Sequence, residues 1–154
     1  MLKKISVGGW ITCAAALLTL VSLIVYASNI ASAGYFQGAS VTNLVLFAVL
    51  AIILYLAAIA VKLFVPADAA SELISGILRI AAPVLIAAAA IALIGSRVEG
   101  LGFIYFSNAD VALEVQTPAN LASASAAITS MVLFGVSMLV GIVAAFLRLT
   151  KKTD

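Results

Sequence analysis

Long apolar runs alternate with short polar segments along this chain of 154 residues. After two lysines near the N-terminus no charged residue occurs before Lys62, and this interval is long enough for two membrane crossings and a turn. The turn is predicted at 28–40, where glycine, serine and asparagine are frequent. The pattern therefore predicts spanning helices over 7–27 and 41–65, each near the roughly twenty residues that a bilayer core requires.

The second half of the chain repeats this arrangement. A short break at 66–72 contains Asp68, which is a favourable N-cap, and it precedes a helix predicted over 73–96. A fourth helix is predicted over 120–149, where an uncharged run ends in a basic tail. These elements predict an all-α integral membrane protein with four transmembrane helices, arranged as two helical hairpins within a single domain, residues 1–154.

The segment 97–119 is the only long stretch that is neither apolar nor part of a basic tail, so we expect it to lie in water. It is the longer of two predicted outer loops, and its sequences GFIYF and VALEV flank the polar turn SNAD, which predicts a short β-hairpin. The hairpin would need support from the shorter loop at 28–40 or from another subunit. It would either cap the bundle, with its aromatic residues at the membrane interface, or bind a partner or ligand. The candidate binding residues in this loop are Phe103, Tyr105, Phe106, Asp110 and Glu114.

Composition and charge place the chain in a membrane and give it an orientation. Hydrophobic residues make up 66% of the chain and charged residues 9%, against about half and about a quarter in soluble domains. Basic residues collect on the cytoplasmic side of membrane proteins, which predicts a multi-pass protein of the plasma membrane with both termini in the cytoplasm. Arg97 is then the only basic residue outside. The basic residues placed inside are Lys3, Lys4, Lys62, Arg79, Arg148, Lys151 and Lys152.

The N-terminal run has a second interpretation as a cleaved signal peptide. Two lysines, an apolar stretch and the small residues at 31–33 resemble the three parts of such a peptide, and cleavage there would leave three spans. The apolar run is longer than the roughly 7 to 15 residues of a signal core, which favours a retained helix.

Arg79 interrupts the third apolar run about two turns from its start. We expect its side chain to reach the lipid headgroups or to pair with Glu72, which lies seven residues back on the same helix face. The alternative is that Arg79 faces a water-filled cavity or an anionic ligand, because charges inside a membrane are costly and often functional.

The sequence excludes most catalytic chemistry. It contains no histidine and a single cysteine, Cys13, so imidazole catalysis, an internal disulfide and a thiolate metal cluster are excluded. A glycine-rich phosphate loop is also absent, and Asp110 with Glu114 is a weak calcium signal. We therefore expect no enzyme activity, no cofactor, no metal site and no nucleic-acid partner.

Small multidrug carriers and rotary proteolipids resemble this chain in compactness and number of spans. Both depend on a carboxylate inside the membrane, whereas the acidic residues here lie in loops or at the C-terminus. The four-span plan also resembles that of tetraspan proteins of animal membranes, but the paired cysteines of tetraspanins and claudins are absent. No family is assigned on these features.

Small and hydroxylated residues in the apolar runs predict close helix packing. Ser137, Gly141 and Ala145 recur at every fourth position of the fourth helix and form a groove that another helix can approach. We expect this groove to hold an oligomer together. Tyr55, near the middle of the second helix, is expected to bond to a hydroxyl group of the first helix.

Two functions are compatible with these features. We predict a small non-catalytic membrane protein that self-assembles or serves as an accessory subunit of a membrane complex, with the 97–120 loop as its recognition or capping element. The alternative is an oligomeric channel or carrier for a small or amphipathic solute, built by several copies because four thin helices enclose little space. In both cases the partners are the lipid bilayer and further copies of the chain or other membrane subunits.

Overall fold

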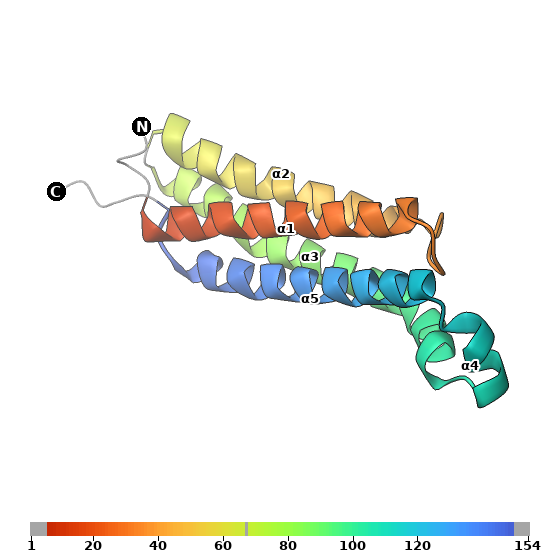
Figure 1. The fold of residues 1–154 in the computed structure, drawn as a ribbon. Coiled ribbons are helices and arrows are strands. Elements are labelled where there is room, and N and C mark those ends of the chain that lie inside the picture. The colour runs from red at the N-terminus through yellow and green to blue at the C-terminus, as the bar shows by residue number, and fades with distance from the viewer. Residues whose placement is uncertain (1–5, 67, 150–154) are drawn as a thin grey trace.

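The computed structural model describes residues 6–66 and 68–149, and its regular structure there is entirely helical (Figure 1). The helices are α1 (Val7–Ala31), α2 (Thr42–Phe64), α3 (Ala69–Phe106), α4 (Ala109–Val115) and α5 (Pro118–Phe146). Among them, α1, α2, α3 and α5 are long and apolar enough to cross a membrane. This count fits a multi-pass membrane protein and agrees with the number of spans predicted from the sequence.

The four long helices form a ring in which each helix packs on two neighbours. Both α1 and α3 lie against α2 and α5, and neighbouring helices run in opposite directions (Figure 1). The contacts between α1 and α5 and between α2 and α3 are the most extensive, so a division into two separate hairpins is not confirmed. The start of α1 and the end of α5 lie at one end of the bundle, the termini end, and α4 lies at the other, the α4 end (Figure 1).

The buried positions of the long helices recur three or four residues apart. In α2 they are Leu44, Ala48, Ala51, Tyr55 and Ala58. A mean spacing of about 3.5 residues keeps one stripe of side chains facing the neighbouring helices along the whole bundle. Many of the stripe positions in α1, α3 and α5 are alanine, serine, threonine or glycine. Such small residues allow the helix backbones to approach closely.

A few large side chains fill the centre of the bundle, while many branched ones face outward. The large buried residues are Tyr26, Leu44, Tyr55, Ile86, Leu93 and Phe134. On the outward surface Leu17 is 61% exposed and Ile91 is 70% exposed. Soluble monomers rarely expose a continuous apolar surface of this extent. The surface therefore fits a chain whose surroundings are lipid.

Side-chain caps mark the starts of α1, α3, α4 and α5, whereas α2 begins after Val41 without one. The Asp68 carboxylate accepts a hydrogen bond from the Ser71 backbone N–H at 2.7 Å, and the Ser71 hydroxyl returns to the Asp68 backbone to complete a capping box. Asn108 and Thr117 cap α4 and α5 through similar side-chain bonds. Asp68 is therefore confirmed as an N-cap, and α3 begins directly after it, about one turn earlier than predicted.

The predicted β-hairpin is wrong, and so is the predicted end of the third helix at residue 96. α3 continues to Phe106, α4 follows, and the described residues contain no strand. The buried stripe of α3 continues past the apolar run through Arg97, Gly100 and Ile104. Because these tertiary contacts follow the helical period, they override the strand preference of the aromatic and β-branched residues.

Candidate functional site

Arg79 lies at the termini end, where α3 packs on the end of α5. Its Nη2 donates to the backbone carbonyls of Ala144 and Leu147, and the residue is only 7% exposed. The end of a helix carries the negative pole of its dipole and leaves carbonyls without helical partners. Arg79 therefore caps α5. The expected ion pair with Glu72 does not form, because Glu72 pairs with Lys62 instead.

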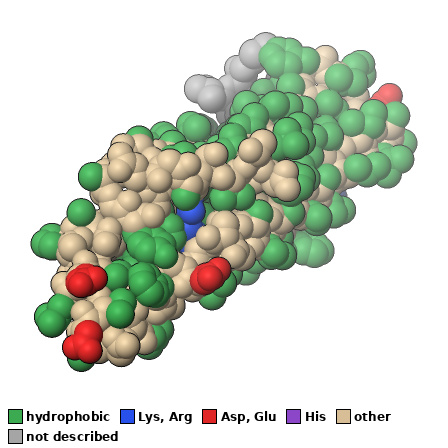
Figure 2. All heavy atoms as spheres, turned by 90° about the vertical axis from the view of Figure 1, so that its right-hand side faces the viewer, with side chains coloured by type: hydrophobic (Ala, Val, Ile, Leu, Met, Phe, Trp, Pro, Cys, Tyr) green, Lys and Arg blue, Asp and Glu red, His purple; other side chains and the backbone are tan. Residues whose placement is uncertain are grey.

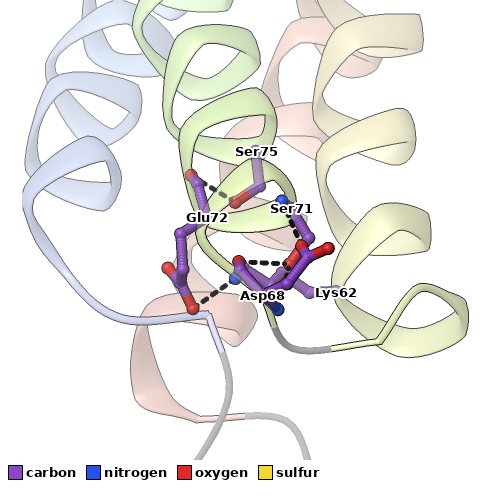
Figure 3. A network of polar contacts seen from close by, with 5 residues as sticks. All are labelled: Lys62, Asp68, Ser71, Glu72 and Ser75. Atoms are coloured by element: carbon purple, nitrogen blue, oxygen red, sulfur yellow. Dashed lines mark hydrogen bonds and ion pairs between the residues drawn. The ribbon is translucent and has the colours of Figure 1, made fainter.

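A polar network joins the end of α2 to the start of α3 (Figure 3). Lys62 in α2 forms an ion pair with Glu72 in the first turn of α3, and the Ser75 hydroxyl donates to the Glu72 carbonyl at 3.1 Å. The side chain of Lys62 is 8% exposed and that of Glu72 is 69% exposed. The capping box of Asp68 and Ser71 completes the network. These contacts fasten the connection between the two helices.

The Asp68 cap makes the start of α3 sensitive to pH. Hydrogen bonds from Ser71 hold the pKa of Asp68 below its ordinary value. A lowered carboxyl pKa stabilises the folded state above the unfolded pKa, and this contribution disappears as the pH falls through the folded pKa. Below about pH 4 we therefore expect weaker protection of the Ser71 amide, measured by hydrogen–deuterium exchange. Asp68→Asn keeps an acceptor without a charge and should lose most of this pH dependence; equal pH dependence in both proteins would contradict the role of Asp68.

Arg97 occupies the corresponding position at the α4 end, buried among aromatic side chains. Its Nη2 donates to the backbone carbonyl of Ala39 in the α1–α2 connection. The centre of its guanidinium lies 4.6 Å from the ring centroid of Phe36 and 5.9 Å from that of Tyr26, within the range of cation–π attraction. Arg97 is 2% exposed. The prediction that it begins a water-exposed loop is therefore wrong, and it fastens α3 to the α1–α2 connection.

The two buried arginines share one face of α3. They are eighteen residues apart, which corresponds to about five helical turns and about 27 Å along the helix axis. A bilayer hydrocarbon core is about 30 Å thick. Arg79 and Arg97 therefore lie near the two boundaries that such a core would have around this bundle, and both use backbone carbonyls of neighbouring segments as acceptors.

Gly100 allows aromatic residues of the α1–α2 connection to lie directly on α3. A Cβ atom at this position would be 2.6 Å from Cε1 of Tyr35 and 2.7 Å from Cε1 of Phe36, closer than packed side chains approach. Phe36 is buried together with Ile104 of α3 and with alanines of α5. The α1–α2 connection thus supports the extension of α3, as expected for the 28–40 loop.

The end of α3, the turn after it and α4 form a helical hairpin, residues 98–117, which we call the α3–α4 hairpin. It projects beyond the other helices (Figure 1). At its base the Gln116 side chain donates to the Ile104 carbonyl at 3.0 Å, and the Asn120 side chain donates to the Val115 carbonyl at 2.8 Å. The first bond joins the end of α4 to α3 within the hairpin, and the second connects the base of the hairpin to α5.

The α3–α4 hairpin exposes apolar and acidic side chains side by side (Figure 2). Phe106 and Leu113 are each 87% exposed, and Asp110 and Glu114 are exposed beside them on α4. Leu113 was not among the predicted binding residues. Two further predicted candidates, Phe103 and Tyr105, are 45% and 41% exposed.

An open pocket of about 470 Å³ lies in the angle between α3 and α4. It is lined by Glu99, Gly102, Phe103, Phe106, Ser107, Asn108 and Val111. Its walls combine aromatic rings with one carboxylate and an amide. Two of the predicted loop candidates, Phe103 and Phe106, therefore meet at this pocket, although on a helix instead of a strand.

A seam of hydroxyl groups joins α1 to α5. The pairs are Thr19 with the Ser137 hydroxyl at 2.6 Å, Ser130 with the Ser22 carbonyl at 3.2 Å, and Ser123 with the Asn29 side chain at 2.9 Å. The serines of α5 are seven residues apart, which is the sequence signal of a continuous stripe. Each hydroxyl has a partner on the facing helix. This agrees with the prediction that these residues serve helix packing.

Gly141 lies in the core of the bundle. A Cβ atom at this position would collide with the Tyr55 hydroxyl and would lie 3.3 Å from Cβ of Pro83. Ser137 is fully buried and Ala145 is partly buried. Tyr55 of α2 and Pro83 of α3 therefore lie against Gly141, and Thr19 of α1 bonds to Ser137. Helices of the same chain thus cover these two positions of the groove that was predicted to hold an oligomer together. The Tyr55 hydroxyl packs against α5, and the expected bond to a hydroxyl of α1 does not form.

Residues 6–66 and 68–149 contain no group of three histidine, cysteine, aspartate or glutamate side chains placed to hold a metal ion. Cys13 lies partly buried in α1. Comparisons of the chain with protein-family models, curated proteins and solved structures found no match.

Proposed function

We propose that this protein is a non-catalytic four-span subunit of a membrane complex and that the α3–α4 hairpin is its recognition element. The main support for this proposal is that Phe106 and Leu113 are each 87% exposed. Both side chains lie on the part of the chain that projects past the bundle, where lipid tails would not cover them. Apolar anchors surrounded by polar residues are typical of protein interaction sites.

A channel or carrier formed by several copies is the alternative function. The centre of one copy is filled, because Tyr55, Ile86, Leu93 and Phe134 are each fully buried there. A solute path would therefore have to run between copies. This makes the alternative dependent on self-assembly, whereas recognition through the α3–α4 hairpin needs only one copy.

Self-assembly is proposed through the outward face of α5 that carries Gly135. A Cβ atom at this position would meet nothing within 4 Å, so a neighbouring helix could approach the backbone closely. We expect Gly135→Leu to lower the particle mass in native mass spectrometry while the fold is kept. A wild-type protein that is monomeric at every concentration tested would contradict this part of the proposal.

We further propose that the α4 end faces outward and that both termini are cytoplasmic. The termini end carries Lys62, Arg79 and Arg148, whereas Arg97 is the only basic residue described at the α4 end, and this distribution follows the positive-inside rule. In a Cys13→Ala background, Ala109→Cys should react with an impermeant thiol reagent applied outside intact cells, and Ala70→Cys should react only after the membrane is opened. The reverse pattern would contradict the orientation.

Recognition by the α3–α4 hairpin can be tested with a photoreactive residue at position 113 in the native membrane. We expect crosslinks to one protein at a fixed stoichiometry. The control is the same residue at position 146, because Phe146 is also 87% exposed but lies at the termini end. Phe106→Ser should weaken the crosslink from position 113 and leave the bundle intact. Equal crosslinking from both positions, or none from position 113, would contradict the proposal.

A further inference from the structure

An apolar groove runs between α3 and α5 in the half of the bundle nearer the termini. It has a volume of about 250 Å³ and only apolar side chains line it. Pro83 and Ala87 of α3 and Ala145 of α5 form its floor, since they are buried or partly buried. The groove exists because these three side chains are short, whereas their neighbours toward the surface are branched or aromatic.

The rims of the groove show what kind of molecule it can hold. Ile80 and Val84 on α3 are 61% and 62% exposed, and Phe146 on α5 is 87% exposed. These side chains stand on either side of the groove. A helix with its side chains is about 10 Å wide, too large to enter a groove of about 250 Å³. A single hydrocarbon chain is narrow enough to lie between them.

A basic residue lies close in the chain to the rim of the groove. Arg148 follows Phe146 by two residues, a distance of at most about 7 Å along an extended chain, and its side chain is exposed. The backbone there is held in place, because the carbonyl of Arg148 accepts a hydrogen bond from the Ser6 hydroxyl. A phosphate group at the level of the lipid headgroups would be within reach of its guanidinium.

We propose that this groove binds one acyl chain of an anionic glycerophospholipid, whose phosphate lies at Arg148. The apolar furrow holds the chain and the arginine selects the charge of the headgroup. The site lies on the face of the bundle between α3 and α5, at the end opposite the α3–α4 hairpin. It is therefore independent of the recognition function proposed above.

Native mass spectrometry of the detergent-solubilised protein, titrated with phosphatidylglycerol or phosphatidylcholine, tests this proposal. We expect one phosphatidylglycerol molecule to be retained about fivefold more strongly than phosphatidylcholine, the preference expected of one basic residue near the headgroups. Arg148→Gln should remove this preference. Ala87→Phe and Ala145→Phe should each fill the groove and lower the retention of both lipids.

Ala14→Phe is the matched control, because Ala14 is exposed on α1, which does not border the groove. Circular dichroism establishes that each variant is folded, and the two groove variants provide independent tests. Equal retention of phosphatidylglycerol by the wild type and both groove variants would overturn the proposal. So would equal retention of the two lipids by the wild type, or a wild-type dimer that Ala87→Phe dissociates, because a second copy would then occupy the groove.

Discussion

Gly141→Leu is expected to destabilise the bundle by about 3 kcal/mol, at the upper end of the range for overpacking a filled core. A side chain at this position has no space, because the Tyr55 hydroxyl and Pro83 already lie against the glycine. Tyr55 is itself fully buried, so its ring has no free space into which it could move. Equilibrium unfolding in mixed micelles, followed by circular dichroism, measures the loss.

Gly95→Leu is the matched control for this prediction. It makes the same change on the exposed side of α3, at a position where a Cβ atom would meet nothing within 4 Å. We expect its free energy of unfolding to stay within about 0.5 kcal/mol of the wild type. If Gly95→Leu and Gly141→Leu had the same effect on unfolding, Gly141 would not lie in the core.

A double-mutant cycle identifies the atom that Gly141 accommodates. Gly141→Ala should cost less in a Tyr55→Phe background than in the wild type, by about 1 kcal/mol, because the nearest atom to the new methyl group is the tyrosine hydroxyl. Equal costs in the two backgrounds would show that Pro83, rather than Tyr55, sets the limit at this position.

The number and approximate positions of the membrane helices could be predicted because they depend on local composition. An uncharged run of about twenty residues predicts a spanning helix without any knowledge of its neighbours. For this reason α1, α2 and α5 lie close to their predicted ranges. The spacing of buried residues in α2 was also present in the sequence. Its small residues at 48, 51 and 58 look like ordinary lipid-facing alanines until the stripe through Tyr55 is followed.

The length of α3 could not be predicted from apolarity, because its last turns contain Arg97, Glu99 and two glycines. Their helical conformation depends on partners far away in the chain. Arg97 is buried only because Phe36 and the Ala39 carbonyl receive its guanidinium. When the segment is judged from its own residue types alone, their strand preference dominates. Contacts with distant residues do not enter such a judgement.

In the 97–119 segment, the exposure of the candidate binding residues was predicted correctly, whereas the secondary structure of the backbone was not. Phe106, Asp110 and Glu114 are exposed, as expected for a segment that lies in water, although they occupy helices. The small residues of the groove predicted on the fourth helix do pack against helices, but at Ser137 and Gly141 these are helices of the same chain. Small residues mark close helix approach, but a sequence does not state which helix approaches. In this bundle Tyr55 of the same chain contacts Gly141.

Arg79→Met is expected to destabilise the bundle by about 2 kcal/mol, with the loss concentrated at the end of α5. The guanidinium donates to the carbonyls of Ala144 and Leu147, and a buried carbonyl that loses its donor costs about 1–3 kcal/mol. Ala144 keeps one partner, the Leu147 backbone N–H at 3.1 Å, and the Leu147 carbonyl is only partly buried, so the expected loss stays below the upper end of this range. Methionine retains most of the volume of the arginine stem, which limits any cavity contribution.

The order of stability of three variants distinguishes the loss of the hydrogen bonds of Arg79 from the loss of a positive charge. Arg79→Lys keeps the charge but replaces the planar fork with a single ammonium group, so its stability should lie between those of the wild type and Arg79→Met. Arg148→Met removes an exposed arginine from the same end and should change the free energy of unfolding little. Hydrogen exchange should locate the added fraying of Arg79→Met in the last two turns of α5. A wild-type exchange pattern there, with Arg79→Met as stable as Arg148→Met, would show that Arg79 does not cap this helix.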